Sequence, residues 1–207
     1  MRSLSLSAAS VPAAMALSMA VAFPAGAAPS APGWASPGGR HCVTQLTADK
    51  PFAAVTGENT TCYATFTEAV ADATGGRITD APRDSVSAMA DPAFDRRVNA
   101  LSQDTGQAVA QASAVILGIE YEHGNYGGGS WIVEADSGCN PDPGLDWGFP
   151  YLGNWNDKIS SFRVYGDCWV NHYEDEDYGG ATTGWRGSTS YIGSAMNDET
   201  SSIIWGG

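Results

Sequence analysis

The chain has 207 residues, a formal net charge of −13 and four cysteines. A protein this acidic repels the phosphate groups of nucleic acids and of anionic lipids, so we expect it to bind neither. Beyond an apolar stretch at the N-terminus, no segment is long and apolar enough to span a bilayer. The composition therefore predicts a soluble mature product.

Residues 1–27 have the pattern of a secretory signal peptide. Arg2 gives the positive start, a run of Ala, Val, Met and Leu gives the apolar centre, and Ala25-Gly26-Ala27 fits a cleavage site. A transmembrane anchor is the alternative, but the run is short, is interrupted by Ser and Pro, and lacks a basic flank. We therefore expect a secreted, extracellular protein in which residues 28–40, rich in Pro, Gly, Ser and Ala, form a flexible lead-in.

Export makes structural disulfides the expected state of the cysteines, which are Cys42, Cys62, Cys139 and Cys168. Four cysteines allow three pairings. Because two lie in each part of the chain, the economical pairing is Cys42–Cys62 and Cys139–Cys168. No Cys-x-x-Cys motif occurs and the His residues are scattered, so neither a zinc site nor thiol redox chemistry is indicated.

Residues 41–111 are predicted to form a small α-containing region linked by a disulfide. Thr65-Phe66-Thr67-Glu68 is a capping-box pattern, and the helix that it opens should stop at Gly75-Gly76. A second helix is expected to open at Asp91-Pro92 with Asp as the N-cap. Its buried face would contain Phe94, Val98 and Leu101 at helical spacing.

The composition changes at about residue 114. Six of the seven Trp and seven of the eight Tyr follow this point, and so do fourteen acidic residues against Lys158, Arg163 and Arg186, a net charge of −11. Val115, Leu117, Ile119 and Tyr121 alternate with other residues, which predicts a strand. Short strands between glycine turns indicate an all-β sandwich or barrel over residues 114–207.

Two sequence elements occur twice in this part of the chain, in the same order. The pattern Tyr-x4-Tyr-x-Gly begins at Tyr121 and again at Tyr173. The hexad Asn-Asp-x-x-Ser-Ser follows at Asn156–Ser161 and again at Asn197–Ser202. The repetition predicts a duplicated four-strand module whose two copies bury a shared face.

This arrangement closely resembles the microbial βγ-crystallin domains. The resemblance implies an all-β, two-Greek-key β-sandwich, with motif one at about 114–166 and motif two at about 167–207, preceded by the small α-containing N-terminal region. It also implies structural roles for the tyrosines, for Gly128 and Gly180 in the folded hairpins, and for Ser161 and Ser202 as hydrogen-bonding partners of those hairpins. The first motif departs from a minimal motif through a long insertion that contains Cys139.

The resemblance further implies that the hexads bind two Ca²⁺ ions, and that each site takes oxygen ligands from both loops. The ligand candidates are Glu122 (carbonyl), Asn156, Asp157, Lys158 (carbonyl), Ser160, Glu174 (carbonyl), Asn197, Asp198, Glu199 (carbonyl) and Ser201. A single hexad would be interpreted as a polar turn that caps its own backbone amides. Two copies in matching contexts on an acidic domain favour calcium, although the ammonium of Lys158 near one site is an objection.

The sequence therefore predicts a secreted, monomeric, calcium-binding βγ-crystallin-like protein in which calcium stabilises the fold. We do not expect the protein to be an enzyme. The alternative function is inhibition of an extracellular peptidase, as in metalloproteinase inhibitors or killer-toxin-like proteins of this fold. Its contact loop would be the long insertion, which carries Pro141, Pro143, Trp147 and Phe149.

A third hypothesis makes residues 41–111 a pro-region or targeting module. Asp104-Thr105-Gly106 is interpreted as a helix-terminating turn, and Asn140-x-Asp142-x-Gly144 fails the EF-hand pattern.

Overall fold

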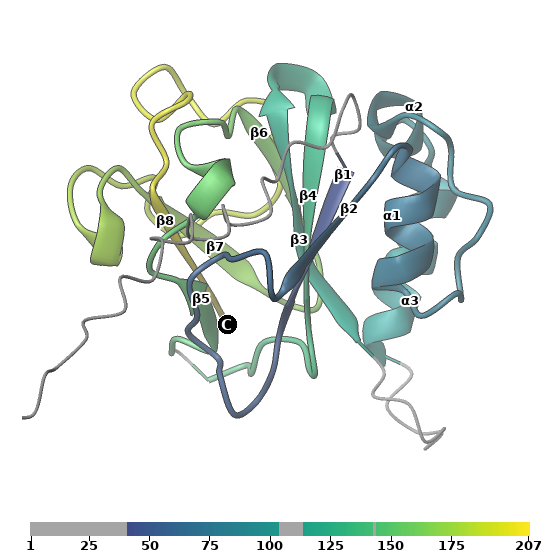
Figure 1. Cartoon of the computed structure of the whole chain (residues 1–207), viewed down its shortest axis with the longest axis horizontal. Helices are drawn as coiled ribbons and strands as arrows, with labels where there is room; N and C mark the ends of the chain where they lie inside the picture. The colour runs from purple at the N-terminus through teal and green to yellow at the C-terminus, as the bar shows by residue number, and fades with distance from the viewer. Residues whose placement is uncertain (1–40, 104–113, 143) are drawn as a thin grey trace, which may run out of the picture. The chain divides into compact units, whose positions relative to one another are not determined.

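Two β-sheets and a group of helices make up the part of the chain that the computed structural model describes, residues 41–103, 114–142 and 144–207 (Figure 1). The predicted signal peptide, the lead-in and the Asp104-Thr105-Gly106 turn lie outside these residues. The elements are β1 (His41–Leu46), β2 (Thr60–Tyr63), α1 (Phe66–Ala73), α2 (Ser85–Met89), α3 (Pro92–Gln103), β3 (Val115–His123), β4 (Gly127–Ala135), β5 (Trp147–Phe149), β6 (Ser161–Val164), β7 (Trp169–Tyr173) and β8 (Ser202–Gly206). Three short 3₁₀ turns, Gly124–Tyr126, Gly153–Trp155 and Glu176–Tyr178, separate some of the described strands.

The strands after residue 114 form two Greek keys. The five-stranded sheet has the order β2-β1-β4-β3-β6, and the three-stranded sheet has the order β5-β8-β7. The third segment of each motif crosses to the other sheet, because β5 pairs with β8 and Thr189 forms a bridge with Phe162 on β6. This exchange joins the two motifs into one sandwich, as the repeat predicted.

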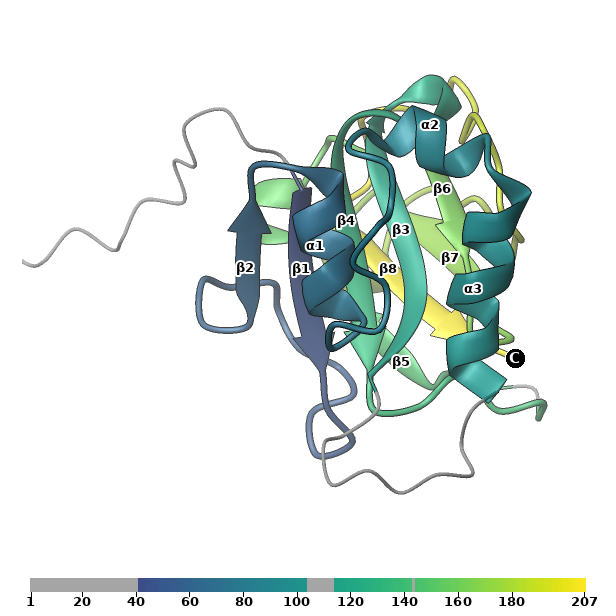
Figure 2. The same ribbon diagram turned by 90° about the vertical axis from the view of Figure 1, so that its right-hand side faces the viewer.

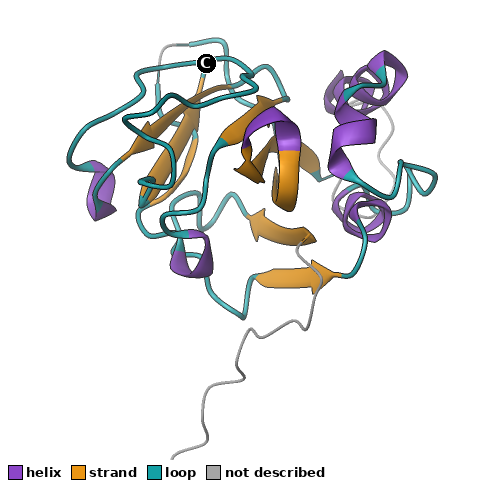
Figure 3. Ribbon diagram, turned by 90° about the horizontal axis from the view of Figure 1, so that it is seen from above, coloured by secondary structure: helices purple, strands orange, loops and turns teal. Residues whose placement is uncertain are grey.

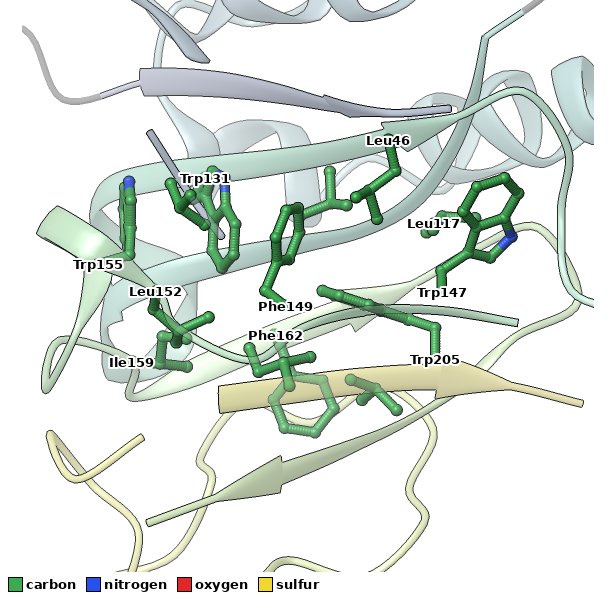
Figure 4. Packing of buried hydrophobic residues seen from close by; sticks show 14 of the residues in the cluster. Leu46, Leu117, Trp131, Trp147, Phe149, Leu152, Trp155, Ile159, Phe162 and Trp205 are labelled. Atoms are coloured by element: carbon green, nitrogen blue, oxygen red, sulfur yellow. The ribbon is translucent and has the colours of Figure 1, made fainter. Parts of the chain in front are cut away.

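Aromatic side chains fill the space between the two sheets (Figure 4). The ring of Trp131 on β4 lies 5.1 Å from that of Phe149 and 5.8 Å from that of Trp155, between ring centroids. Trp205 on β8 contacts Phe149 edge-on at 6.0 Å. Burying rings of this size supplies most of the apolar area of such a core, which explains why the tryptophans are concentrated in this part of the chain.

The region before residue 104 contributes strands as well as helices. Strand β1 runs parallel to β4, and β2 pairs with β1 in the antiparallel direction to form the edge of the five-stranded sheet. Thr44 on β1 accepts a 2.7 Å hydrogen bond from the indole nitrogen of Trp131 in the sandwich core. The sequence did not reveal these strands. Both are short, and β1 pairs with a strand that lies almost ninety residues away.

The helices cover the other face of the five-stranded sheet (Figures 2 and 3). Phe66 of α1 and Phe94 of α3 pack there against Ile119 and Ile132 of the sheet, and all four side chains are fully buried or nearly so. Helix α1 begins as its capping box predicts, with Thr65 and Glu68 bonding to each other's backbone nitrogens. The described residues lie within one compact unit.

Both predicted disulfides are present, Cys42–Cys62 between β1 and β2 and Cys139–Cys168 between the insertion and the segment before β7. The second bond ties the insertion of motif one to motif two. In the part of the chain that is described, no helix has the length and apolar character needed to cross a membrane.

Candidate functional site: the paired hexads

The two Tyr-x4-Tyr-x-Gly segments fold into hairpins with nearly the same backbone. The ring centroids of Tyr121 and Tyr126 lie 5.4 Å apart, and those of the corresponding pair Tyr173 and Tyr178 lie 5.8 Å apart. The positive φ values also match: 56° at Asn125 and 53° at Asp177, 65° at Tyr126 and at Tyr178, and 76° at Gly128 and 72° at Gly180. This confirms that the sequence repeat is a structural repeat.

The last serine of each hexad holds its own motif's hairpin. Ser161 Oγ donates to the carbonyl oxygen of His123 at 2.6 Å and accepts from the backbone nitrogen of Tyr126 at 3.0 Å. Ser202 Oγ makes the matching bonds to Asp175 and Tyr178, at 2.6 and 2.9 Å. The structural role predicted for these two serines is therefore confirmed.

The two hexads lie side by side and bond to each other through their backbones. The nitrogen of Asp157 donates to the carbonyl oxygen of Thr200 at 3.0 Å, and that of Asp198 donates to the carbonyl oxygen of Ile159 at 3.1 Å. Both aspartates have a left-handed backbone, with φ of 55° and 59°. Asp tolerates this conformation better than most residues, which accounts for an Asp at this position in each copy.

One oxygen cluster forms around Ser160. Its hydroxyl donates to the carbonyl oxygen of Glu122 at 2.8 Å and lies 3.2 Å from Oδ1 of Asp198. The three oxygens come from a hairpin, from one hexad and from the other hexad. A carbonyl, a hydroxyl and a carboxylate are the kinds of oxygen that Ca²⁺ binds, so the donor set fits this ion.

A second, more open cluster forms around Ser201. Its hydroxyl lies 3.5 Å from Oδ1 of Asp157, and its backbone nitrogen donates to the carbonyl oxygen of Tyr173 at 2.9 Å. Ser160 makes the matching backbone bond to Tyr121, also at 2.9 Å. The two clusters are thus related by the internal repeat, and each takes its serine from one hexad and its aspartate from the other.

The remaining candidates have supporting positions. The side-chain nitrogens of Asn156 and Asn197 donate to Oδ2 of the adjacent aspartates, at 2.8 and 2.7 Å. This leaves Oδ1 of each aspartate directed at the serine of the other hexad. The asparagines therefore orient the carboxylates of the adjacent aspartates. Their side-chain oxygens form no hydrogen bond with the described members of either cluster.

The carboxylates of Glu122 and Glu174 cap their own hairpins, because they accept from the backbone nitrogens of Gly129 and Ala181 at 2.9 and 3.0 Å. The carbonyl oxygen of Glu122, which accepts from Ser160, is thus the atom by which this residue meets a hexad. Lys158 and Glu199 are exposed, and no ion pair of the described residues involves either of them. The ammonium of Lys158 therefore does not neutralise either aspartate.

The insertion differs from the contact loop that the alternative function requires. Trp147 and Phe149 are 5% and 0% exposed and belong to the core of the sandwich, so their proposed role as contact residues is wrong. They are buried because β5 pairs with β8. The insertion exposes two large apolar side chains, Leu145 at 55% and Tyr151 at 41%, while Asn140 bonds to Asp146 within the loop.

A buried pair of ionisable residues was missed in the sequence. Glu120 and His172 are both fully buried and lie 3.1 Å apart, from the carboxylate to Nε2. Each residue precedes the first tyrosine of its repeat, so the pair joins equivalent positions of the two motifs across the sandwich. Their equivalent positions in the repeat were the signal from which the sequence could have predicted this pair. Burial raises the pKa of Glu120, and the neighbouring His172 opposes this rise.

These features define the class of the domain: a β-sandwich of two Greek keys with paired hexads, extended by β1, β2 and the helices. Solved microbial βγ-crystallin domains match this part of the chain. An archaeal domain is 32% identical, over 43% of this chain and 95% of that domain, with a TM-score of 0.32. A domain from Flavobacterium johnsoniae is 26% identical, over 43% of this chain and 92% of that domain, with a TM-score of 0.32. A domain from Clostridium beijerinckii is 22% identical, over 43% of this chain and 95% of that domain, with a TM-score of 0.34. Over less than half of its length, the chain is thus similar to microbial βγ-crystallin domains, as the repeat predicted.

Residues 120–185 match the sequence model of peptidase inhibitor family I36, which is less than half of the chain. The matched segment runs from β3 to the loop after β7 and includes both cysteines of the second disulfide. Among the curated proteins, none matches the chain. In the described part of the chain, no group of three or more His, Cys, Asp and Glu side chains is arranged so that it could hold a metal ion. A site at the hexads would therefore also depend on hydroxyl and carbonyl oxygens.

Proposed function

We propose that this is a secreted calcium-binding protein in which the ions stabilise the βγ-crystallin-like sandwich. The observation that carries the proposal is the exchange of side chains between the hexads. Ser160 meets Asp198, and Ser201 meets Asp157. Glu122 adds its carbonyl oxygen to the first cluster. A bound cation would replace hydrogen bonds between these oxygens with ligand bonds and would link the two motifs.

Calcium should raise the thermal stability of the protein. Ions that bind only the folded state add about 2.7 kcal/mol per site when their concentration is a hundred times the dissociation constant. We expect the melting temperature to rise with millimolar calcium and the dissociation constants to lie between about 10⁻⁶ and 10⁻³ M. Calorimetry and thermal melts of the purified protein measure both quantities. A flat titration together with an unchanged melt would refute the proposal.

Variants then test the exchange between hexads. Asp198→Ala and Ser160→Ala should weaken the same binding event, because these side chains contact each other. Asp157→Ala and Ser201→Ala should weaken the other event. Asp142→Ala is the matched control, because it removes an exposed carboxylate from the same domain outside the hexads. Pairing of the effects within one hexad would contradict the proposed arrangement.

A second candidate function, inhibition of an extracellular metallopeptidase, is favoured by the match of residues 120–185 to family I36. In this hypothesis the exposed Leu145 belongs to the contact surface, since the disulfide of Cys139 anchors its loop. At about 1 µM, a concentration that detects inhibitors of moderate affinity, the protein should inhibit a thermolysin-like peptidase.

The substitution Leu145→Asp should weaken this inhibition at least tenfold. The matched control is Val86→Asp, which changes a residue that is 49% exposed and lies outside the matched segment. Residual activity of the peptidase on a peptide substrate is the measurement. Full activity in the presence of the unchanged protein removes this second function and leaves the calcium proposal untouched.

A further inference from the structure

A pocket of about 610 Å³ lies away from the hexads, beside the last turn of α1. Gln45 of β1 and Glu134 of β4 are register partners that line it, together with Thr61 of β2 and Asp72 of α1. Because side chains alternate along a strand, Gln45 and Glu134 share the sheet face of Val43 and Ile132, which pack under the helices. The pocket therefore continues the helix-covered face of the sheet.

Glu134 is buried in this pocket without a partner. The residue is 9% exposed, and its Oε2 is buried and has no hydrogen-bonding partner. No ion pair within the described residues reaches it. Asp72 and Asp136 add negative charge around it, and burial first, then these two carboxylates, raise the pKa of Glu134 to about 8. A buried carboxyl group without a donor is costly, so the pocket lacks a complementary group.

The lining specifies the chemistry of that group. Glu58, Asp72 and Glu134 contribute carboxylates, against the single cation Lys50. Ala53 and Ala54 give the pocket an apolar wall. Its volume suits a small organic ligand or a long side chain. Among the described residues, no three carboxylate, His or Cys side chains are arranged so that they could hold a metal ion. A ligand with an alkyl chain that ends in a cation would pack its alkyl chain against the apolar wall and pair its charge with the carboxylates.

We propose that this pocket binds an organic cation of the guanidinium or alkylammonium type, with Glu134 and Asp72 as its carboxylate partners. A planar guanidinium can donate two parallel hydrogen bonds to one carboxylate. The source of the cation is either a free small molecule or an arginine or lysine side chain of another protein. This binding site is independent of calcium and of the hexads.

The test is calorimetric titration of the full chain with n-butylguanidine, with neutral n-butylurea as the isosteric control. We expect saturable binding of the guanidine alone, and at least a tenfold loss of affinity in Glu134→Gln. Glu176→Gln is the matched control variant, because Glu176 is an exposed carboxylate on the hairpin of motif two. Its affinity should equal that of the unchanged protein, and Lys50→Ala should bind at least as tightly.

Proton release gives a second measurement that a merely structural Glu134 would not produce. At pH 7, a cation that binds to Glu134 must displace the carboxyl proton, because the pKa of this group is raised to about 8. Titrations in two buffers of different ionisation enthalpy should show this release in the unchanged protein, and Glu134→Gln should lose it.

A capped Gly-Arg-Gly peptide distinguishes the sources. Tighter binding than that of n-butylguanidine assigns the pocket to a protein side chain, and weaker binding assigns it to a free cation. The proposal is overturned if neither cation saturates the protein by about 10 mM, a limit for weak specific binding. Equal binding of the urea, or equal binding by Glu134→Gln, also overturns it.

Discussion

Replacing His172 by alanine is expected to lower the free energy of unfolding by about 3–5 kcal/mol, the usual cost of truncating a fully buried ring and leaving a buried polar group without its partner. The substitution leaves Glu120 buried without the one side-chain partner that it has among the described residues. It also removes a ring whose centroid lies 4.5 Å from that of Phe162. Urea unfolding at neutral pH measures the loss.

Two further variants separate the pair from simple packing. Glu120→Ala should also destabilise the protein, and the double variant should lose less than the sum of the single losses, because contacting residues are coupled. His123→Ala is the matched control, since His123 is an exposed histidine at the corresponding hairpin, and it should change stability by less than about 0.5 kcal/mol. Strictly additive losses would show that Glu120 and His172 do not act together.

Glu134→Gln is expected to stabilise the protein at alkaline pH and to have little effect at acidic pH. Burial, reinforced by Asp72 and Asp136, raises the pKa of Glu134 from 4.5 to about 8. The folded protein therefore keeps a proton that the unfolded chain loses. This contribution to stability is complete below pH 4.5 and is lost as the pH rises to about 8.

The difference between the two pKa values, at about 1.4 kcal/mol per pH unit, sets an upper limit of about 5 kcal/mol on the gain at pH 9. Denaturant unfolding at pH 5, 7 and 9 should show the variant diverging steadily from the unchanged protein. Glu58→Gln, an exposed carboxylate in the same pocket, should follow the unchanged protein. A constant difference at all three pH values would contradict the assigned pKa.

The local elements were predicted well where the sequence contains its own signal. Asp91 caps α3, since its carboxylate accepts from the backbone nitrogen of Ala93 at 2.8 Å, and the strand predicted from Val115 is β3. Caps and alternating strands depend on neighbours within a few residues. The repeat also predicted that the two hairpins would match, and the resemblance to βγ-crystallin domains predicted that Ser161 and Ser202 would bond to them.

The sequence by itself determined the duplicated sandwich and the oxygen-rich hexads, because each is encoded in a repeated local pattern. It allowed three pairings of the four cysteines, and the structure has the most economical of them. Only the tertiary structure decided that β1 extends the sheet, that Glu120 meets His172, and that Glu134 is isolated in a pocket. Each of these features depends on a contact between segments that are distant in the sequence. For example, the pairing of β1 with β4 places Gln45 opposite Glu134. The hexads show both contributions together. Their composition specifies the oxygens, and the crossing of the two motifs specifies which serine meets which aspartate.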